Sequence, residues 1–96
     1  MSIKDKYVTE LTSKFEACVD IVQNGTAAKK PTQEEKLEFY ALFKQATQGD
    51  APDKKPSFFD MVAFAKWTAW DKLRGQSQEQ AMQTYVDRVE KEKSTA

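Results

Sequence analysis

The chain has 96 residues, which is enough for one small domain and not for two, so we expect residues 1–96 to form a single domain. Hydrophobic residues make up 40% and aromatic residues 11% of the sequence, which is not the composition of a disordered chain. The 15 Lys and Arg residues balance the 15 Asp and Glu residues, so the net charge gives no support to binding of nucleic acid or a membrane surface. Recognition of an anion must therefore come from a local cluster.

Two common kinds of reactive site are not expected. The sequence has no histidine and a single cysteine, Cys18, so it has no disulfide framework and we expect no metal site. The commonest general base is also missing, although carboxylate chemistry remains possible. The N-terminus lacks the apolar run of a signal peptide, and no stretch of about 18 apolar residues occurs, so we expect a cytoplasmic protein.

Glycines and prolines divide the chain into four periodic segments, and we expect helices over about 3–24, 32–48, 59–73 and 77–92. Each of the first three segments ends at a glycine, namely Gly25, Gly49 and Gly75, placed as the residue that follows a helix. No segment of useful length alternates apolar and polar residues as a strand does. The sequence therefore predicts an all-α fold.

The first predicted helix has one apolar face. Its members recur at steps of three and four and are Ile3, Tyr7, Leu11, Phe15, Cys18 and Val22. We interpret Cys18 as a small buried core residue on this face. Residues 1–10 are expected to be an N-terminal extension of this helix.

The second predicted helix begins after Pro31 with Thr32 and Glu35 spaced as a capping box. Its core face is predicted to contain Phe39, Leu42, Phe43 and Ala46. Lys36, Leu37, Tyr40 and Lys44 form a flank beside that face.

Tyr40 and Lys44 are four residues apart, so their side chains can meet over one helical turn. A lysine offers a mobile positive charge and a tyrosine offers a hydroxyl on a flat ring. Together they suit a phosphate that lies beside a stacked ring. The alternative is a boundary tyrosine beside a solvated lysine, as on many surface helices.

In the third predicted helix, Lys66 lies on a face that otherwise holds large apolar side chains. Those side chains are Phe59, Val62, Trp70 and Leu73. A lone ammonium group buried there would cost several kcal/mol or lose its proton. The lysine stem can cover apolar surface while its head reaches water, and Lys66 and Lys44 can converge on an anion; the two interpretations are compatible.

Three aromatic residues of the same helix have different expected places. Trp67 and Trp70 lie beside the apolar centre of the helix, and we interpret them as core residues rather than as platforms for a ligand. Phe64 falls on the polar side, where it is either incidental or extends an apolar groove.

The last predicted helix begins with a second capping box, Ser77 and Gln80, and has a single apolar face. That face contains Ala81, Met82, Tyr85, Val86 and Val89. Residues 93–96 are expected to be a frayed tail. The connection between the second and third helices is longer than the others, so a simple up-down-up-down order is not assured.

Two long motifs resemble the acyl-CoA-binding protein family. They are "YxxxKQATxGD", beginning at Tyr40, and "AKWxAWxxLxGxSxExAMxxYxxxV", which runs through the third and fourth predicted helices. The match extends from about Pro31 to Glu90, and the first helix is compatible from about Phe15.

The resemblance implies a four-helix bundle in up-down-down-up order that binds medium- to long-chain acyl-CoA non-covalently, without a cofactor and without catalysing a reaction. In the family pattern, the tyrosine and lysine of "YxxxK" and the lysine of "AKW" hold the 3′-phosphate and adenosine of CoA. The tyrosine of "AMxxY" also contacts the ligand. The residues implied as ligand-binding here are Tyr40, Ala41, Leu42, Phe43, Lys44, Lys66 and Tyr85, with Lys36, Leu37 and Phe64 as possible residues of the acyl groove or its rim.

Several positions depart from the family pattern. Phe43 stands where a second tyrosine is usual, Lys36 where methionine is common, Phe64 where lysine is common and Ser57 where glycine often follows the proline. These positions gather around the expected tail groove, so no chain-length preference is carried over.

The sequence thus predicts a carrier that binds, buffers and transports acyl-CoA. We expect a cytoplasmic monomer with no nucleic-acid partner and at most transient contact with membranes or acyl-CoA-using enzymes. The alternative is a helical protein-interaction module on the same fold, in which Tyr40, Lys44 and Phe64 form a docking surface.

Overall fold

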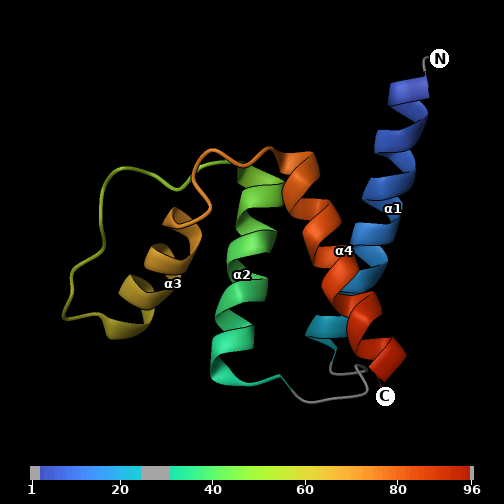
Figure 1. Ribbon diagram of the computed structural model, residues 1–96. Coiled ribbons are helices and arrows are strands. Elements are labelled where there is room, and N and C mark those ends of the chain that lie inside the picture. Colours follow the sequence, from blue (N-terminus) through green and yellow to red (C-terminus); the bar gives the residue numbers. More distant parts are fainter. Residues whose placement is uncertain (1–2, 25–30, 96) are drawn as a thin grey trace.

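The computed structural model describes residues 3–24 and 31–95, with side chains from 6–24 and 31–91. These residues contain four helices: α1 (Ile3–Gln23), α2 (Gln33–Gln48), α3 (Met61–Asp71) and α4 (Gln78–Thr95). The described ranges contain no strand, as the sequence predicted. The chain therefore has the all-α architecture expected of it (Figure 1).

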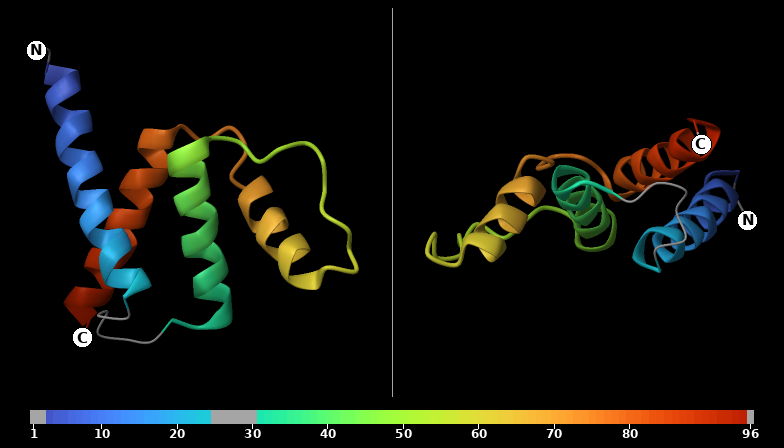
Figure 2. Two further views of the ribbon diagram at one scale, coloured as in Figure 1. Left: turned by 180° about the vertical axis from the view of Figure 1, so that it is seen from behind. Right: turned by 90° about the horizontal axis from the view of Figure 1, so that it is seen from below.

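The helices follow the up-down-down-up order. Figure 1 shows α1 and α4 running in one direction and α2 and α3 in the other. The long connection 49–60 returns the chain to the start of α3, which makes α3 parallel to α2. Figure 2 shows α2 between α3 and α4, while α1 lies on α4. The packed helix pairs are α2 with α4, α2 with α3 and α1 with α4.

Most of the predicted helix ends are confirmed. The Thr32 hydroxyl accepts a hydrogen bond from Glu35 N at 3.1 Å, and Thr32 N donates to Glu35 Oε1 at 3.2 Å, which completes the capping box. Gly49 and Gly75 have φ angles of 82° and 94°, in the region that favours glycine. The prediction for Gly25 lies outside the described residues.

Ser77 stands just before α4 and caps its first turn, as expected. Its hydroxyl accepts a hydrogen bond from Gln80 N at 3.0 Å, which is the first half of the predicted capping box. α4 then continues to Thr95, past the predicted end at residue 92.

The predicted start of α3 at residue 59 is wrong. The Asp60 side chain accepts a hydrogen bond from Ala63 N at 3.2 Å, so it caps the helix and α3 begins at Met61. Phe59 therefore lies outside the helix. The predicted end at residue 73 is also late, because α3 ends at Asp71 and the next turn closes with tighter bonds, from Leu73 N to Trp70 O and from Arg74 N to Asp71 O.

The main core lies among α1, α2 and α4. Its buried residues are Leu11, Phe15, Cys18, Phe39, Leu42, Ala46, Ala81, Tyr85, Val86 and Val89. The apolar faces predicted for these three helices account for all of them. Tyr7 is the exception on the α1 face, because it is half exposed and its hydroxyl donates to Gln83 Oε1 at 3.2 Å.

Tyr85 lies at the centre of this core. Its ring meets Phe15 and Phe39 edge-on, with 5.1 Å between centroids in each case, and it is 2% exposed. Burial, with a smaller contribution from Cys18, raises the pKa of the Tyr85 phenol well above its ordinary value.

The raised pKa predicts a loss of stability in alkali. The unfolded chain ionises this phenol near its ordinary pKa of about 10, whereas the folded chain keeps it protonated, so the free energy of unfolding falls as the pH rises above about 10. The contribution of Tyr85 should fall by up to about 1.4 kcal/mol per pH unit there. In denaturant unfolding at pH 9 to 11, Tyr85→Phe should show a shallower pH dependence than the unchanged protein; equal slopes would contradict this prediction.

A smaller core joins α2 to α3. It contains buried Ala41, Ala51 and Trp70, with Trp67, Ala69 and Leu73 packed against it. Both indole groups also hold the connection 49–60, because Trp70 Nε1 donates to Gly49 O and Trp67 Nε1 donates to Pro52 O, each at 2.8 Å. The prediction of a core residue is confirmed for Trp70, which is 7% exposed, whereas Trp67 is only partly buried at the edge of this core.

Gln45 links the ends of three helices. It is fully buried, and its amide nitrogen donates to Asp50 Oδ1 and Gln76 O, each at 2.9 Å. Gly75 N also donates to Asp50 Oδ1 at 2.9 Å. Both bonds to Asp50 lower the pKa of its carboxyl group, and the bond from Gly75 has the larger effect. The network fixes how α3 is positioned against α2.

Candidate functional site

The structure brings Tyr40, Lys44 and Lys66 to the boundary between α2 and α3. The Lys66 ammonium nitrogen lies 5.3 Å from the centre of the Tyr40 ring, and the Lys44 nitrogen lies 5.1 Å from the centre of the Trp70 ring. Each helix therefore places a lysine over an aromatic ring of the other helix. We call Tyr40, Lys44, Lys66 and Trp70 the lysine–aromatic site.

The apolar face around Lys66 is not buried along its length. Lys66 is exposed, and so are Val62 and Phe59, at 66% and 83%. Only Trp70, toward the C-terminal end of α3, is buried. The expected conflict between a charge and an apolar core is therefore absent, and the ammonium group is accessible to a ligand.

A cavity of about 410 Å³ adjoins the lysine–aromatic site. Its lining consists of Tyr40, Pro56, Asp60, Val62, Ala63, Lys66, Trp67 and Trp70. Sequence reasoning did not assign Trp67 or Trp70 to a ligand cavity, nor did it single out Lys55, whose ammonium nitrogen lies 5.9 Å from the centre of the Trp67 ring. The adjacent Lys54 and Lys55, just before Pro56, were the sequence feature that could have indicated a lysine near this cavity.

This arrangement suits a phosphate attached to an aromatic ring system. Lysines donate charge-assisted hydrogen bonds to phosphate oxygens, and the Tyr40 hydroxyl is a further donor. Flat aromatic faces in the same cavity offer surfaces for stacking. The Asp60 carboxylate lines the cavity as well, but it caps α3 through Ala63 N.

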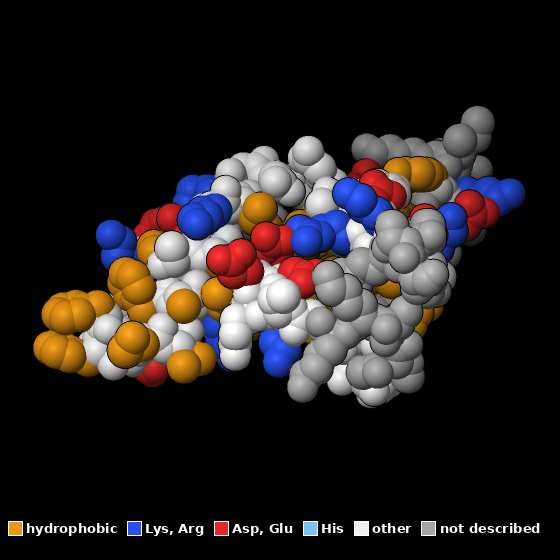
Figure 3. All heavy atoms as spheres, turned by 60° about the horizontal axis from the view of Figure 1, so that its bottom comes forward, with side chains coloured by type: hydrophobic (Ala, Val, Ile, Leu, Met, Phe, Trp, Pro, Cys, Tyr) orange, Lys and Arg blue, Asp and Glu red, His pale blue; other side chains and the backbone are white. Residues whose placement is uncertain are grey.

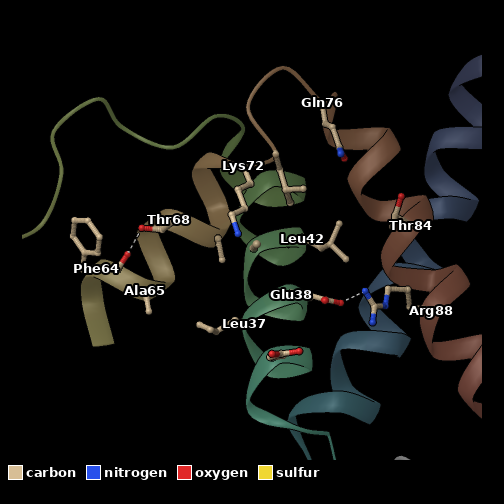
Figure 4. A pocket seen from close by; sticks show the side chains of 14 residues that line it. Leu37, Glu38, Leu42, Phe64, Ala65, Thr68, Lys72, Gln76, Thr84 and Arg88 are labelled. Carbon is tan, nitrogen blue, oxygen red and sulfur yellow. Dashed lines mark hydrogen bonds and ion pairs between the residues drawn. The ribbon is translucent and has the colours of Figure 1, made fainter. Parts of the chain in front are cut away.

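A larger cavity of about 770 Å³ lies along α2. One side of it is formed by α3 and the turn that follows α3, and the other side by α4. Apolar residues form much of its lining, namely Leu37, Ala41, Leu42, Phe64, Ala65, Ala69 and Leu73. Figure 4 shows Lys72 directed toward the space between α3 and α2, and the ion pair between Glu38 and Arg88 at the α4 side. Such a groove, apolar inside and charged at its rim, suits an apolar chain with a polar end.

Six of the residues predicted for ligand binding line one of these two cavities, which share no lining residue. Tyr40 and Lys66 line the smaller one, and Lys44 lines neither but lies over Trp70 in its wall. Leu37, Ala41, Leu42 and Phe64 line the larger cavity, and Phe64 is half-buried there, with its ring centroid 6.4 Å from that of Trp67. Lys36 is exposed and lines neither cavity.

Phe43 and Tyr85 are not brought to the lysine–aromatic site. Phe43 stacks on Phe15 of α1 with 6.2 Å between centroids, beside a third cavity of about 640 Å³. Tyr85 is enclosed in the main core. The family pattern implied ligand contacts for both, and the helical spacing of Phe43 and Tyr85 had already assigned them to core faces.

No group of three or more metal-ligating side chains is found within residues 6–24 and 31–91. None of the helices described is both long and apolar enough to cross a membrane.

Comparison with known proteins gives a family match. The family model described as "Acyl CoA binding protein" matches residues 12–89. The chain is 42% identical over 80 residues to the acyl-CoA-binding protein homolog of Drosophila melanogaster, covering 83% of this chain and 91% of that protein. It is 40% identical over 81 residues to acyl-CoA-binding domain-containing protein 5 of Gallus gallus, of which it spans only 16%.

A solved structure is similar over almost the whole chain. Acyl-CoA-Binding Protein 2 of Oryza sativa matches with a TM-score of 0.81 and 32% sequence identity, over 93% of this chain and 97% of that one. The helix arrangement described above is thus shared with a protein of that name.

Proposed function

This chain belongs to the acyl-CoA-binding protein family, and we propose that it binds medium- to long-chain acyl-CoA thioesters non-covalently. The observation that carries the proposal is the pair of reciprocal lysine–aromatic contacts, Lys66 over Tyr40 and Lys44 over Trp70, beside an open cavity. The family match favours this interpretation over a protein-interaction module.

In the proposed complex, the lysine–aromatic site holds the phosphate-bearing adenosine of CoA. Lys44 and Lys66 would pair with the 3′-phosphate, because two ammonium groups that share an anion avoid mutual repulsion. The Tyr40 hydroxyl would donate to the same phosphate, and an aromatic face would stack on the adenine.

The larger cavity is proposed to take the acyl tail. Leu37 and Tyr40 are three residues apart and therefore adjacent on the surface of α2. A ligand held beside Tyr40 would pass Leu37 to enter the groove. Each methylene removed from water contributes about 0.8 kcal/mol, so affinity should rise with chain length until the groove is filled.

We propose that the protein acts as a carrier that buffers acyl-CoA and moves it between enzymes, rather than as an enzyme. Two features of the sequence support this assignment: it contains no histidine, and it contains no glycine-rich phosphate loop. A cytoplasmic monomer fits the same role.

Isothermal titration calorimetry with palmitoyl-CoA, free CoA and palmitate tests the proposal. Tight one-to-one binding of palmitoyl-CoA, with much weaker binding of the other two, is expected because head and tail act together. No binding of palmitoyl-CoA by folded, helical protein would overturn the proposal.

The place of Phe64 in the tail groove gives a prediction. In Phe64→Lys, an ammonium group would stand beside the apolar chain, so the Kd for long-chain acyl-CoA should rise roughly three- to tenfold, which corresponds to about 1 kcal/mol. Phe64→Leu serves as the control, because it keeps the side chain apolar. In calorimetry across chain lengths, the effect should disappear for acetyl-CoA; unchanged affinity for every chain length would place Phe64 away from the ligand.

A further inference from the structure

An apolar tip projects from the molecule where the connection 49–60 enters α3. It consists of Phe58, Phe59, Met61 and Val62, which are 67%, 83%, 77% and 66% exposed. Figure 3 shows apolar side chains gathered at the α3 end of the molecule, with both basic and acidic side chains beside them. Contiguous exposure of four large apolar residues is unusual for a surface that faces only water.

The tip is a folded turn rather than a loose loop. Asp60 N donates to Ser57 O at 3.0 Å, and Phe59 N donates to Ser57 Oγ at 3.2 Å. The Asp60 side chain then caps α3. The Phe58 and Phe59 rings stack on each other with 4.3 Å between centroids. The backbone thus holds both rings outward, away from the two cores.

Lysines lie on both sides of this tip in the sequence. Lys54 and Lys55 precede it in the chain, and Lys66 follows it on α3, and all three are exposed. Of the neighbouring acids, Asp53 pairs with Arg74 at 3.4 Å and Asp60 is engaged as the helix cap. Exposed aromatic and aliphatic side chains flanked by lysines are the pattern that binds anionic lipid surfaces.

We propose that this tip docks the protein on anionic membranes, with Phe58, Phe59, Met61 and Val62 entering the headgroup region and the lysines facing acidic lipids. The docking needs no bound acyl-CoA. Its consequence, on the function proposed above, is to bring the lysine–aromatic cavity to the lipid surface, because Val62 also lines that cavity.

A second copy of the chain fits this surface less well. Four side chains are far fewer than the roughly 20–30 residues a side that a standard protein interface uses. A two-fold contact would also bring the flanking lysines of both copies together. The bound ligand is no better an occupant, since Phe58, Phe59 and Met61 line neither of its proposed cavities.

Cosedimentation of the ligand-free protein with vesicles tests the proposal. We expect the protein to bind phosphatidylcholine vesicles that contain phosphatidylserine. Binding should be weaker to vesicles without phosphatidylserine and should decrease with added salt. The double change Phe58→Ser and Phe59→Ser should lower the partition coefficient at least about tenfold. Tyr7→Ser, which removes an exposed aromatic residue of α1, should leave it unchanged.

The charges are tested separately. Lys54→Glu with Lys55→Glu should reduce binding to the anionic vesicles severalfold more than Lys6→Glu with Lys14→Glu, which changes the net charge equally on α1. Circular dichroism melting checks that each variant is folded.

Three results would overturn the proposal. The first is that the protein binds neither kind of vesicle, and the second is that the Phe58/Phe59 variant binds as strongly as the unchanged protein. The third is a dimer in sedimentation equilibrium that this variant converts to a monomer. Calorimetry of the same variant with palmitoyl-CoA in the absence of vesicles reports on the proposed function independently. Unchanged affinity there is expected.

Discussion

Replacing Lys66 with alanine is expected to raise the Kd for palmitoyl-CoA about 10- to 100-fold. A hydrogen bond to a charged group contributes about 1.5–3 kcal/mol, and the change would remove one such bond to the phosphate. It would also leave Lys44 as the only lysine of the lysine–aromatic site. Because Lys66 is exposed and packs over Tyr40 only at its end, the fold should be unaffected.

Calorimetry on matched variants separates a specific phosphate contact from a general loss of charge. Lys44→Ala and Tyr40→Ala should also weaken binding strongly, because Tyr40 lines the smaller cavity and the Lys44 ammonium nitrogen lies 5.1 Å from the centre of the Trp70 ring in its wall. Lys36→Ala should change binding little, since Lys36 is exposed on the same helix, away from both cavities. Equal losses at Lys36, Tyr40 and Lys44 would contradict the assigned geometry. A Lys66→Ala variant that binds as tightly as the unchanged protein would do the same.

Much of the fold follows from local patterns in the sequence. The core faces of α1, α2 and α4 repeat at helical spacing over about two turns or more, and such a stripe matches the period of a helix and not that of a strand. Thr32 and Gly49 mark the two ends of α2 by their own backbone chemistry, which needs no tertiary contact. These predictions are therefore the ones confirmed.

The start of α3 was predicted two residues too early, at residue 59 instead of Met61. Phe59 and Val62 were placed on the apolar face of a helix that began at residue 59, whereas Asp60 caps the helix and both side chains are exposed, at 83% and 66%. Hydrophobicity was taken as a sign of burial. In this turn it marks an exposed surface instead.

The site was predictable in part. Spacing alone placed Tyr40 beside Lys44, but the pairing of Lys66 with Tyr40 depends on how α3 packs on α2. That packing is set by contacts between residues far apart in sequence, such as Gln45 with Gln76 and Trp67 with Pro52. No periodicity in either helix encodes these contacts. The same limitation explains why Trp67 and Trp70 were assigned to the core without their additional place in the cavity wall.

The largest effect on stability is expected for Trp70→Ala, with a decrease of about 3–5 kcal/mol in the free energy of unfolding. Trp70 is the one large buried side chain of the small core between α2 and α3, where it packs with Ala41 and Ala51. The change would leave a cavity and would also leave Gly49 O without the indole donor. Since α2 is the helix on which α3 packs, α3 should lose its order first.

Urea unfolding gives the global effect, and hydrogen exchange shows where order is lost. Amides of α3 should lose protection more than those of α1 and α4, whose core does not include Trp70. Trp70→Phe is the matched control, because it keeps an apolar ring but lacks the donor to Gly49 O, and it should cost about 1–2 kcal/mol. If Trp70→Ala were to reduce protection equally in all four helices, α3 would unfold together with the main core, and the small core would not be the separate support that its contacts indicate.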